Sequence, residues 1–117
     1  MSRRLAGYDY SQPGFYFVTL CIEQRRPVFG TITEGQVFLR RPGQMAETLW
    51  VSLPRRFAYV KLDAYVFMPN HLHGIIQLTE YDPTSTAPRA PLGEIVRTFK
   101  AVTAYQIRHS EGSPWFA

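Results

Sequence analysis

Residues 65–76 read Tyr65-Val66-Phe67-Met68-Pro69-Asn70-His71-Leu72-His73-Gly74-Ile75-Ile76. Proline has no amide hydrogen for a sheet ladder, so Met68-Pro69-Asn70 is expected to form a turn or a strand end. We therefore predict one long strand over residues 60–68 and another, antiparallel to it, over residues 71–79. Because side chains alternate across a strand, His71 and His73 are expected on the same face of the sheet.

The chain before this stretch predicts a further strand, a hairpin and a helix. Phe15–Ile22 is rich in β-branched and aromatic residues and reads as a central strand. Two short strands are expected near residues 28–32 and 37–40, with a turn at Glu34-Gly35 and an end at Pro42-Gly43. An apolar residue at every fourth position predicts a helix over residues 44–53, and Pro54 is expected to stop it.

The chain after this stretch predicts a loop and a second helix. Residues 81–91 contain several proline, serine and threonine residues and read as a loop. Residues 92–109 carry apolar residues at the spacing of one helix face. Gly112 and Pro114 are expected to end that helix.

This order of elements predicts an α+β fold. Strand, hairpin, helix, strand, strand and helix are typical of an antiparallel sheet with helices packed on one face. A ferredoxin-like split β-α-β arrangement fits best. The chain has 117 residues, so we expect a single domain over residues 1–117.

Composition narrows the possible partners and the compartment. No run of 18 apolar residues is present, so no membrane partner is expected. The single cysteine, Cys21, fits a reducing compartment, and we expect a cytoplasmic protein. The net charge is +4, and all of the surplus lies in residues 1–60, as four Arg-Arg pairs. Arginine matches phosphate oxygens, so a nucleic acid is a plausible partner, although an ordinary solvated basic surface explains the charge equally well.

Two imidazoles one residue apart on a strand are able to share one cation. Any metal site needs further ligands, either protein groups, substrate oxygens or waters. Glu23 and Asp63 are candidates on other strands. Gly74 would allow another backbone or a ligand to approach closely. The alternative is that His71 and His73 are two polar residues on a wet sheet face.

Several segments together resemble the single-tyrosine transposases of the HUH superfamily, especially the REP-associated tyrosine transposases. The first two are Gly7-Tyr8-Asp9-Tyr10-Ser11 and Gly14-Phe15-Tyr16-Phe17-Val18-Thr19. The third is the histidine stretch quoted above, in which Met-Pro-Asn-His-x-His-Gly is quite specific. The helix that begins at Leu92 and contains Phe99-Lys100 also resembles the family. The similarity runs in order over nearly the whole chain.

The resemblance implies a DNA-processing site. His71 and His73 would bind a divalent metal, magnesium or manganese, above a phosphate of single-stranded or hairpin DNA. The family's metal-dependent strand cleavage and rejoining moves a mobile element, and its members act as monomers or homodimers, so a homodimer is one open alternative. A basic groove with stacking aromatic residues would hold the DNA. The candidate DNA-binding residues are Arg3, Arg4, Tyr8, Tyr10, Arg25 and Arg26.

The sequence departs from the family near its end. The family's nucleophilic tyrosine follows a tryptophan that corresponds here to Trp115, and the chain then reads Phe116-Ala117. We therefore expect the chain to lack the nucleophile helix, as a fragment or a natural truncation, and not to cleave DNA. Tyr105 lies within the preceding helix and is not expected to replace the nucleophile.

Three functions therefore stay open. The chain is a transposase-type domain without its tyrosine, a DNA-binding remnant without catalysis, or an unrelated small α+β metal-binding protein.

Overall fold

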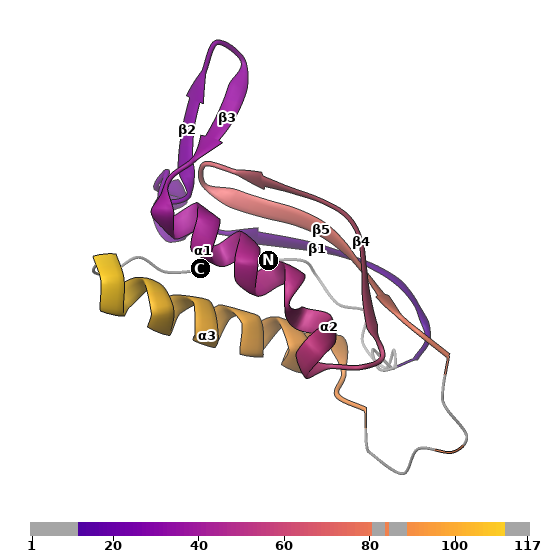
Figure 1. Cartoon of the computed structure of the whole chain (residues 1–117). Helices are drawn as coiled ribbons and strands as arrows, with labels where there is room; N and C mark the ends of the chain where they lie inside the picture. The colour runs from indigo at the N-terminus through magenta and orange to yellow at the C-terminus, as the bar shows by residue number, and fades with distance from the viewer. Residues whose placement is uncertain (1–11, 81–83, 85–88, 112–117) are drawn as a thin grey trace.

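A computed structural model describes residues 12–80, 84 and 89–111 of the chain. Its main sheet contains β1 (Gly14–Cys21), β5 (His71–Leu78) and β4 (Val60–Met68), in that order. A hairpin of β2 (Gly30–Thr33) and β3 (Gln36–Leu39) stands apart from the sheet. The helices α1 (Arg41–Val51), α2 (Leu53–Arg56) and α3 (Leu92–Glu111) lie on one side of the sheet, and the hairpin projects from one end (Figure 1).

The strand β5 is the centre of the sheet and pairs antiparallel with both neighbours. The prediction that the first strand is central was wrong, because among the described residues β1 pairs only with β5 and lies at an edge of this sheet. Since β1 and β4 both run opposite to β5, they are parallel to each other and are connected through α1, which is the predicted split β-α-β unit. The structure therefore confirms the α+β fold with helices on one face of an antiparallel sheet. The three long strands lie within one residue of their predicted bounds.

Burial alternates along the strands, so the sheet has one covered and one open face. On β5, Leu72, Gly74, Ile76 and Leu78 are buried under the helices. The intervening residues of β5, His71, His73, Ile75 and Gln77, are exposed or half-buried on the open face. Because successive side chains of β5 point to opposite faces, one set packs in the core and the other set faces the solvent.

Gly74 is required by the core. The indole of Trp50 is fully buried and packs edge to face on Phe99, with ring centroids 5.3 Å apart. A Cβ added at Gly74 would lie 2.6 Å from Cζ2 of Trp50, which is closer than any ordinary contact. The expectation that Gly74 admits a backbone or a ligand was therefore wrong, because its bare side faces the core and accommodates an indole.

The helix α1 differs from its prediction at both ends. It begins at Arg41 instead of residue 44, because proline is well tolerated in the first helical turn and Pro42 occupies that turn. Gly43 is buried there against the backbone of Phe29. At the other end α1 stops at Val51, and Pro54 lies within the short helix α2 instead of ending α1.

The helix α3 confirms the predicted apolar stripe. Ile95, Phe99, Thr103 and Ile107 are all nearly or fully buried. The hairpin strands are shifted by one or two residues from their expected bounds, and Glu34 and Gly35 form the predicted turn with left-handed φ angles of 51° and 78°. The predicted helix end at Gly112 and Pro114, and most of the expected loop over residues 81–91, lie outside the described residues.

Across the described segments, no helix combines the length and the hydropathy needed to cross a membrane.

Candidate functional site

The two histidines lie side by side at the start of the central strand. In the register of the sheet, His71 is opposite Cys21 and Met68, and His73 is opposite Thr19 and Val66. The two imidazole centroids are 4.6 Å apart and the rings are inclined at 78°. Both rings are therefore on the open face, as side-chain alternation predicted, and neither is locked inside the core.

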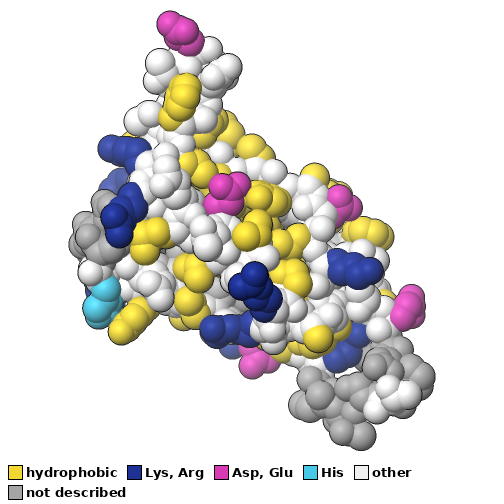
Figure 2. All heavy atoms as spheres, viewed as in Figure 1, with side chains coloured by type: hydrophobic (Ala, Val, Ile, Leu, Met, Phe, Trp, Pro, Cys, Tyr) yellow, Lys and Arg dark blue, Asp and Glu magenta, His cyan; other side chains and the backbone are white. Residues whose placement is uncertain are grey.

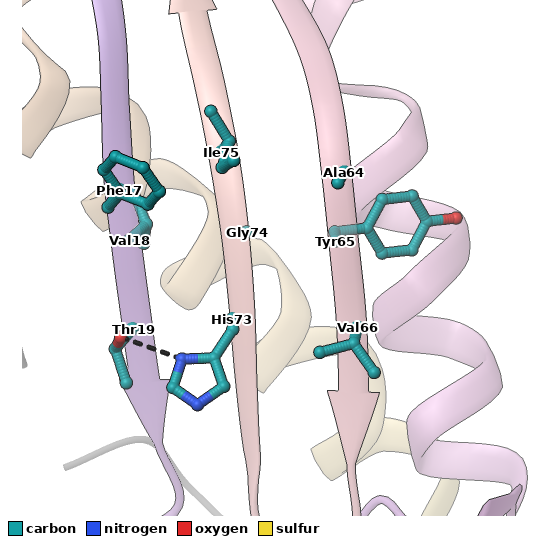
Figure 3. A pocket seen from close by; sticks show the side chains of 9 residues that line it. All are labelled: Phe17, Val18, Thr19, Ala64, Tyr65, Val66, His73, Gly74 and Ile75. Carbon is teal, nitrogen blue, oxygen red and sulfur yellow. Dashed lines mark hydrogen bonds between the residues drawn. The ribbon is translucent and has the colours of Figure 1, made fainter.

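Each imidazole is held by a hydrogen bond at Nδ1. The Nδ1 atom of His71 lies 2.7 Å from Oδ1 of Asn70. An amide oxygen only accepts, so His71 carries its proton on Nδ1, and its Nε2 keeps a free lone pair. The Nδ1 atom of His73 lies 3.0 Å from the Thr19 hydroxyl (Figure 3). A hydroxyl both donates and accepts, so in the tautomer that carries its proton on Nδ1 the hydroxyl accepts and Nε2 of His73 keeps its lone pair. Donating Nδ1–H to a carboxylate, a carbonyl or a water is how proteins usually orient a histidine that binds metal through Nε2, and the Asn70 amide oxygen is a partner of this kind.

A strained turn brings an arginine beside this pair. The short 3₁₀ helix η1 (Glu23–Arg25) follows β1, and Gln24 and Arg25 adopt left-handed φ angles of 58° and 54°. Left-handed backbone is unusual for residues other than glycine and often marks a functional site. The Asn70 amide donates from Nδ2 to the Arg25 carbonyl at 3.3 Å. Asn70 therefore links the arginine turn to the His71 ring.

The surroundings of His71 favour its neutral form. Burial lowers the pKa of His71 below its ordinary 6.5, and the positive charges of His73 and Arg25 lower it further. Only a neutral imidazole binds metal. The local electrostatics thus favour the protonation state that a metal site requires.

Of the predicted DNA-binding residues, Arg25 and Arg26 are both exposed, and Arg25 lies close enough to His71 for its charge to act on that ring. Arg3, Arg4, Tyr8 and Tyr10 lie outside the described residues. Basic side chains also gather where the β2–β3 hairpin meets the start of α1 (Figure 2). In contrast, Arg55 and Arg56 belong to α2, which lies just before the start of β4. The partner of His71, Met68, is at the opposite end of β4. Arg55 and Arg56 therefore lie away from Arg25 and Arg26.

The acidic candidates for a third ligand are not assembled around the histidines. Asp63 lies at the irregularity in β4, five residues before the partner of His71, and its Oδ1 accepts from the Ala64 amide at 2.7 Å. Glu23 is exposed in η1. Within the described residues, no group of three His, Cys, Asp or Glu side chains is placed to hold a metal ion.

The four tyrosines of the described segments all have other surroundings. Tyr16 and Tyr59 donate to the carbonyls of Gln12 and Ala90 at 2.8 and 3.3 Å. Tyr65 donates to Glu47 at 3.2 Å, and burial, followed by that hydrogen bond and the charge of Glu47, raises its pKa above 10.0. A phenol held in its neutral form is a poor nucleophile.

Tyr105 is exposed on α3, on the helix side of the sheet, and stacks on His109 with ring centroids 4.0 Å apart. It is therefore separated from the histidine pair by the sheet itself, which agrees with the expectation that it is not a nucleophile.

Sequence reasoning assigned no role to Asn70 or Thr19. Asn70 directly precedes His71, so the sequence alone could have suggested that its short amide side chain bonds to the neighbouring imidazole. Thr19 is 54 residues from His73 in sequence and meets it only through the β1–β5 register.

Comparison with known proteins finds similarity to a curated protein sequence and to solved structures. No protein-family model matches the sequence. An uncharacterized protein from Haemophilus influenzae is 37% identical, over 94% of this chain and 69% of its own length. A REP-associated tyrosine transposase bound to a REP hairpin superposes with a TM-score of 0.64 at 20% identity, over 100% of this chain. A putative transposase from Deinococcus radiodurans superposes with a TM-score of 0.56 at 15% identity, over 99% of this chain and 83% of its own.

The chain spans 60% of the length of the REP-associated transposase. The similarity to the Haemophilus protein is high enough, and covers enough of both chains, to establish common family membership, while the two transposases share the fold. The chain therefore belongs to the same family as the Haemophilus influenzae protein and has the fold of the REP-associated tyrosine transposase.

Proposed function

We propose that this chain is a DNA-binding, transposase-type domain that acts in metal-dependent cleavage and rejoining of single-stranded or hairpin DNA during transposition. The observation that carries the proposal is the orientation of His71 and His73, whose Nδ1 atoms are both hydrogen-bonded and whose rings adjoin on the open face. The shared fold with a transposase bound to a REP hairpin supports the same conclusion.

The donor chemistry fits a divalent cation. Two neutral imidazoles alone favour zinc or copper, whereas magnesium and manganese prefer oxygen. Phosphate oxygens and waters would supply the remaining ligands for those harder ions, which suits a site that the described acidic residues do not complete. When bound, the ion would act as a Lewis acid on the phosphate.

The residues of the chain then have distinct tasks. His71 and His73 hold the cation, while Asn70 and Thr19 orient the two rings. Arg25 and Arg26 contact neighbouring phosphates, because a planar guanidinium pairs well with phosphate oxygens. For the reasons given above, the proposal does not place the attacking hydroxyl on any of the four tyrosines that the structure describes.

The metal role is tested by DNA binding with and without manganese. We expect manganese to strengthen binding of a labelled hairpin oligonucleotide with a single-stranded flank, as measured by fluorescence anisotropy against an EDTA control. The variants His71→Ala and His73→Ala should lose this enhancement. His109→Ala is the matched control, because His109 is exposed on α3 and should keep it. An enhancement that survives in both of the first two variants would refute the metal role.

The phosphate contacts are tested by salt dependence. Each lost contact to single-stranded DNA lowers the slope of log K against log salt by about 0.7. Replacing Arg25 and Arg26 together by glutamine should therefore lower the slope by about 1.4. The same double replacement of Arg55 and Arg56, at the other end of the fold, should leave it unchanged. Equal slopes for both double variants would contradict the assignment.

A further inference from the structure

The open face of the sheet carries an apolar depression directly beside His73. Its volume is about 420 Å³, within the range of about 300–1,000 Å³ that small organic groups occupy. It lies between β1 and β4, over the central strand β5 (Figure 3). The depression is lined by side chains of the open face that include Phe17, Ala64, Val66 and Ile75.

Phe17 is the most prominent of these side chains. Its exposed fraction is 75%, the largest of any large hydrophobic residue in the described segments. A phenyl ring with so much surface in water gains free energy when a flat apolar group covers it. Phe15, next but one along β1, is 58% exposed on the same face, so two aromatic rings stand in a row.

The sheet register relates this row to the histidine pair. Thr19 pairs with His73, Phe17 pairs with Ile75, and Phe15 pairs with Gln77. Two residues along a strand span about 6.6 Å, so each aromatic ring lies one such step further from the imidazoles. A nucleotide whose phosphate is at His73 is thereby close enough to direct its base onto Phe17.

The chemistry at the two ends of the apolar row argues for a base-sized occupant. His73 and Thr19 bound it at one end. At the other end Gln77 lies opposite Lys61 in the register and brings an amide and a cation onto the same face. An amphipathic helix needs a long continuous apolar groove, whereas this apolar strip is interrupted by polar groups on both sides. A nucleobase has an apolar face and a polar edge, and the phosphate that follows it is negatively charged. A single strand of DNA therefore matches the aromatic rings, the amide and the cation on this face.

We propose that Phe17 is a stacking platform for an unpaired nucleobase next to the phosphate at the histidine pair, with Phe15 receiving the following base. This inference rests on the proposed function, since it places the phosphate at His71 and His73. Aromatic side chains on an open sheet face stack bases in other nucleic-acid-binding domains, and the contact tolerates any base because every base has a π face.

The test combines a protein variant with an abasic nucleotide. The full chain is titrated, with manganese present, against labelled hairpin oligonucleotides whose single-stranded flank carries one abasic site at successive positions. At one position the abasic site should weaken binding to the wild type roughly tenfold, and Phe17→Ala should weaken binding of the intact oligonucleotide by a similar factor. In the Phe17→Ala protein the abasic site should then cost nothing further, because the two changes remove the same contact.

Two further variants complete the design. Phe17→Tyr keeps the ring and should bind like the wild type. Phe38→Ala is the matched control, because Phe38 is 52% exposed on the separate hairpin and should leave both affinities unchanged. Melting curves of all variants establish that the exposed substitutions leave the fold intact.

The outcomes separate this inference from the proposed function. If the wild type binds the oligonucleotides and every abasic site costs the wild type and Phe17→Ala equally, the stacking site is refuted and DNA binding stands. An unchanged affinity of Phe17→Ala for the oligonucleotides also refutes the stacking site. If Phe17→Ala changes only the self-association of the protein, the stacking site is refuted as well, and the face packs against a second copy of the chain. If the wild type binds no oligonucleotide, the proposed function itself fails and the stacking site falls with it.

Discussion

Asn70 offers a direct test of how the site is built. Its side chain accepts from Nδ1 of His71 at 2.7 Å and donates to the Arg25 carbonyl at 3.3 Å. The variant Asn70→Ala removes both hydrogen bonds and leaves His71 and His73 themselves unchanged. The His71 ring then rotates and exchanges its proton between Nδ1 and Nε2, so part of the population presents no lone pair to a cation.

The expected loss of metal affinity can be estimated from other groups that orient metal-bound histidines. Loss of the group that orients a metal-bound histidine lowers metal affinity about 10–100-fold. We expect a loss in this range for Asn70→Ala, measured as the dissociation constant for manganese in the presence of the hairpin oligonucleotide, by electron paramagnetic resonance of the free ion. A tenfold loss corresponds to about 1.4 kcal/mol.

The variant Asn70→Asp is the matched control. It keeps an oxygen that accepts from Nδ1 and loses only the donor to Arg25, so it should bind manganese at least as tightly as the wild type, since carboxylates are common partners of metal-bound histidines. Equal affinity for the wild type and Asn70→Ala, with unchanged melting curves, would refute the orienting role of Asn70.

Three further predictions concern stability. Gly74→Ala should lower the free energy of unfolding by about 1–3 kcal/mol and the melting temperature by several degrees, because its Cβ would lie 2.6 Å from the Trp50 ring; an unchanged melting temperature would contradict this. Thr103→Val should raise stability, because the fully buried Thr103 hydroxyl has no hydrogen-bond partner among the residues that the structure describes, and a lower melting temperature would count against it. Burial raises the pKa of Tyr65 above 10.0, so its stabilising effect is present below pH 10 and is lost as the pH rises through the folded-state value. Tyr65→Phe should therefore flatten the fall in melting temperature above pH 10, and a parallel pH profile would speak against the assignment.

Local sequence rules were sufficient for the elements that carry the site. Alternation along residues 71–78 places His71 and His73 on one face, because it depends only on the strand geometry. The apolar spacing of α3 is likewise a local property, and its buried residues match the expected stripe. The strand bounds are accurate because Pro69 interrupts the ladder between β4 and β5.

The features that sequence reasoning missed depend on distant contacts. Thr19 reaches His73 only because β1 pairs with β5 in one register. Gly43 looked like the end of a unit, although it is a buried helix residue packed against the backbone of Phe29. Whether a glycine ends a helix or allows close packing is decided by tertiary structure, so the start of α1 was predicted three residues late.

The two faces of β5 have consequences for how this fold can diversify. Leu72, Gly74 and Ile76 are constrained by the helices, whereas the side chains between them contribute little to the core. Substitutions on the open face can therefore accumulate without unfolding the protein, and a lineage, or an engineer, is free to change what this face binds while the scaffold stays the same.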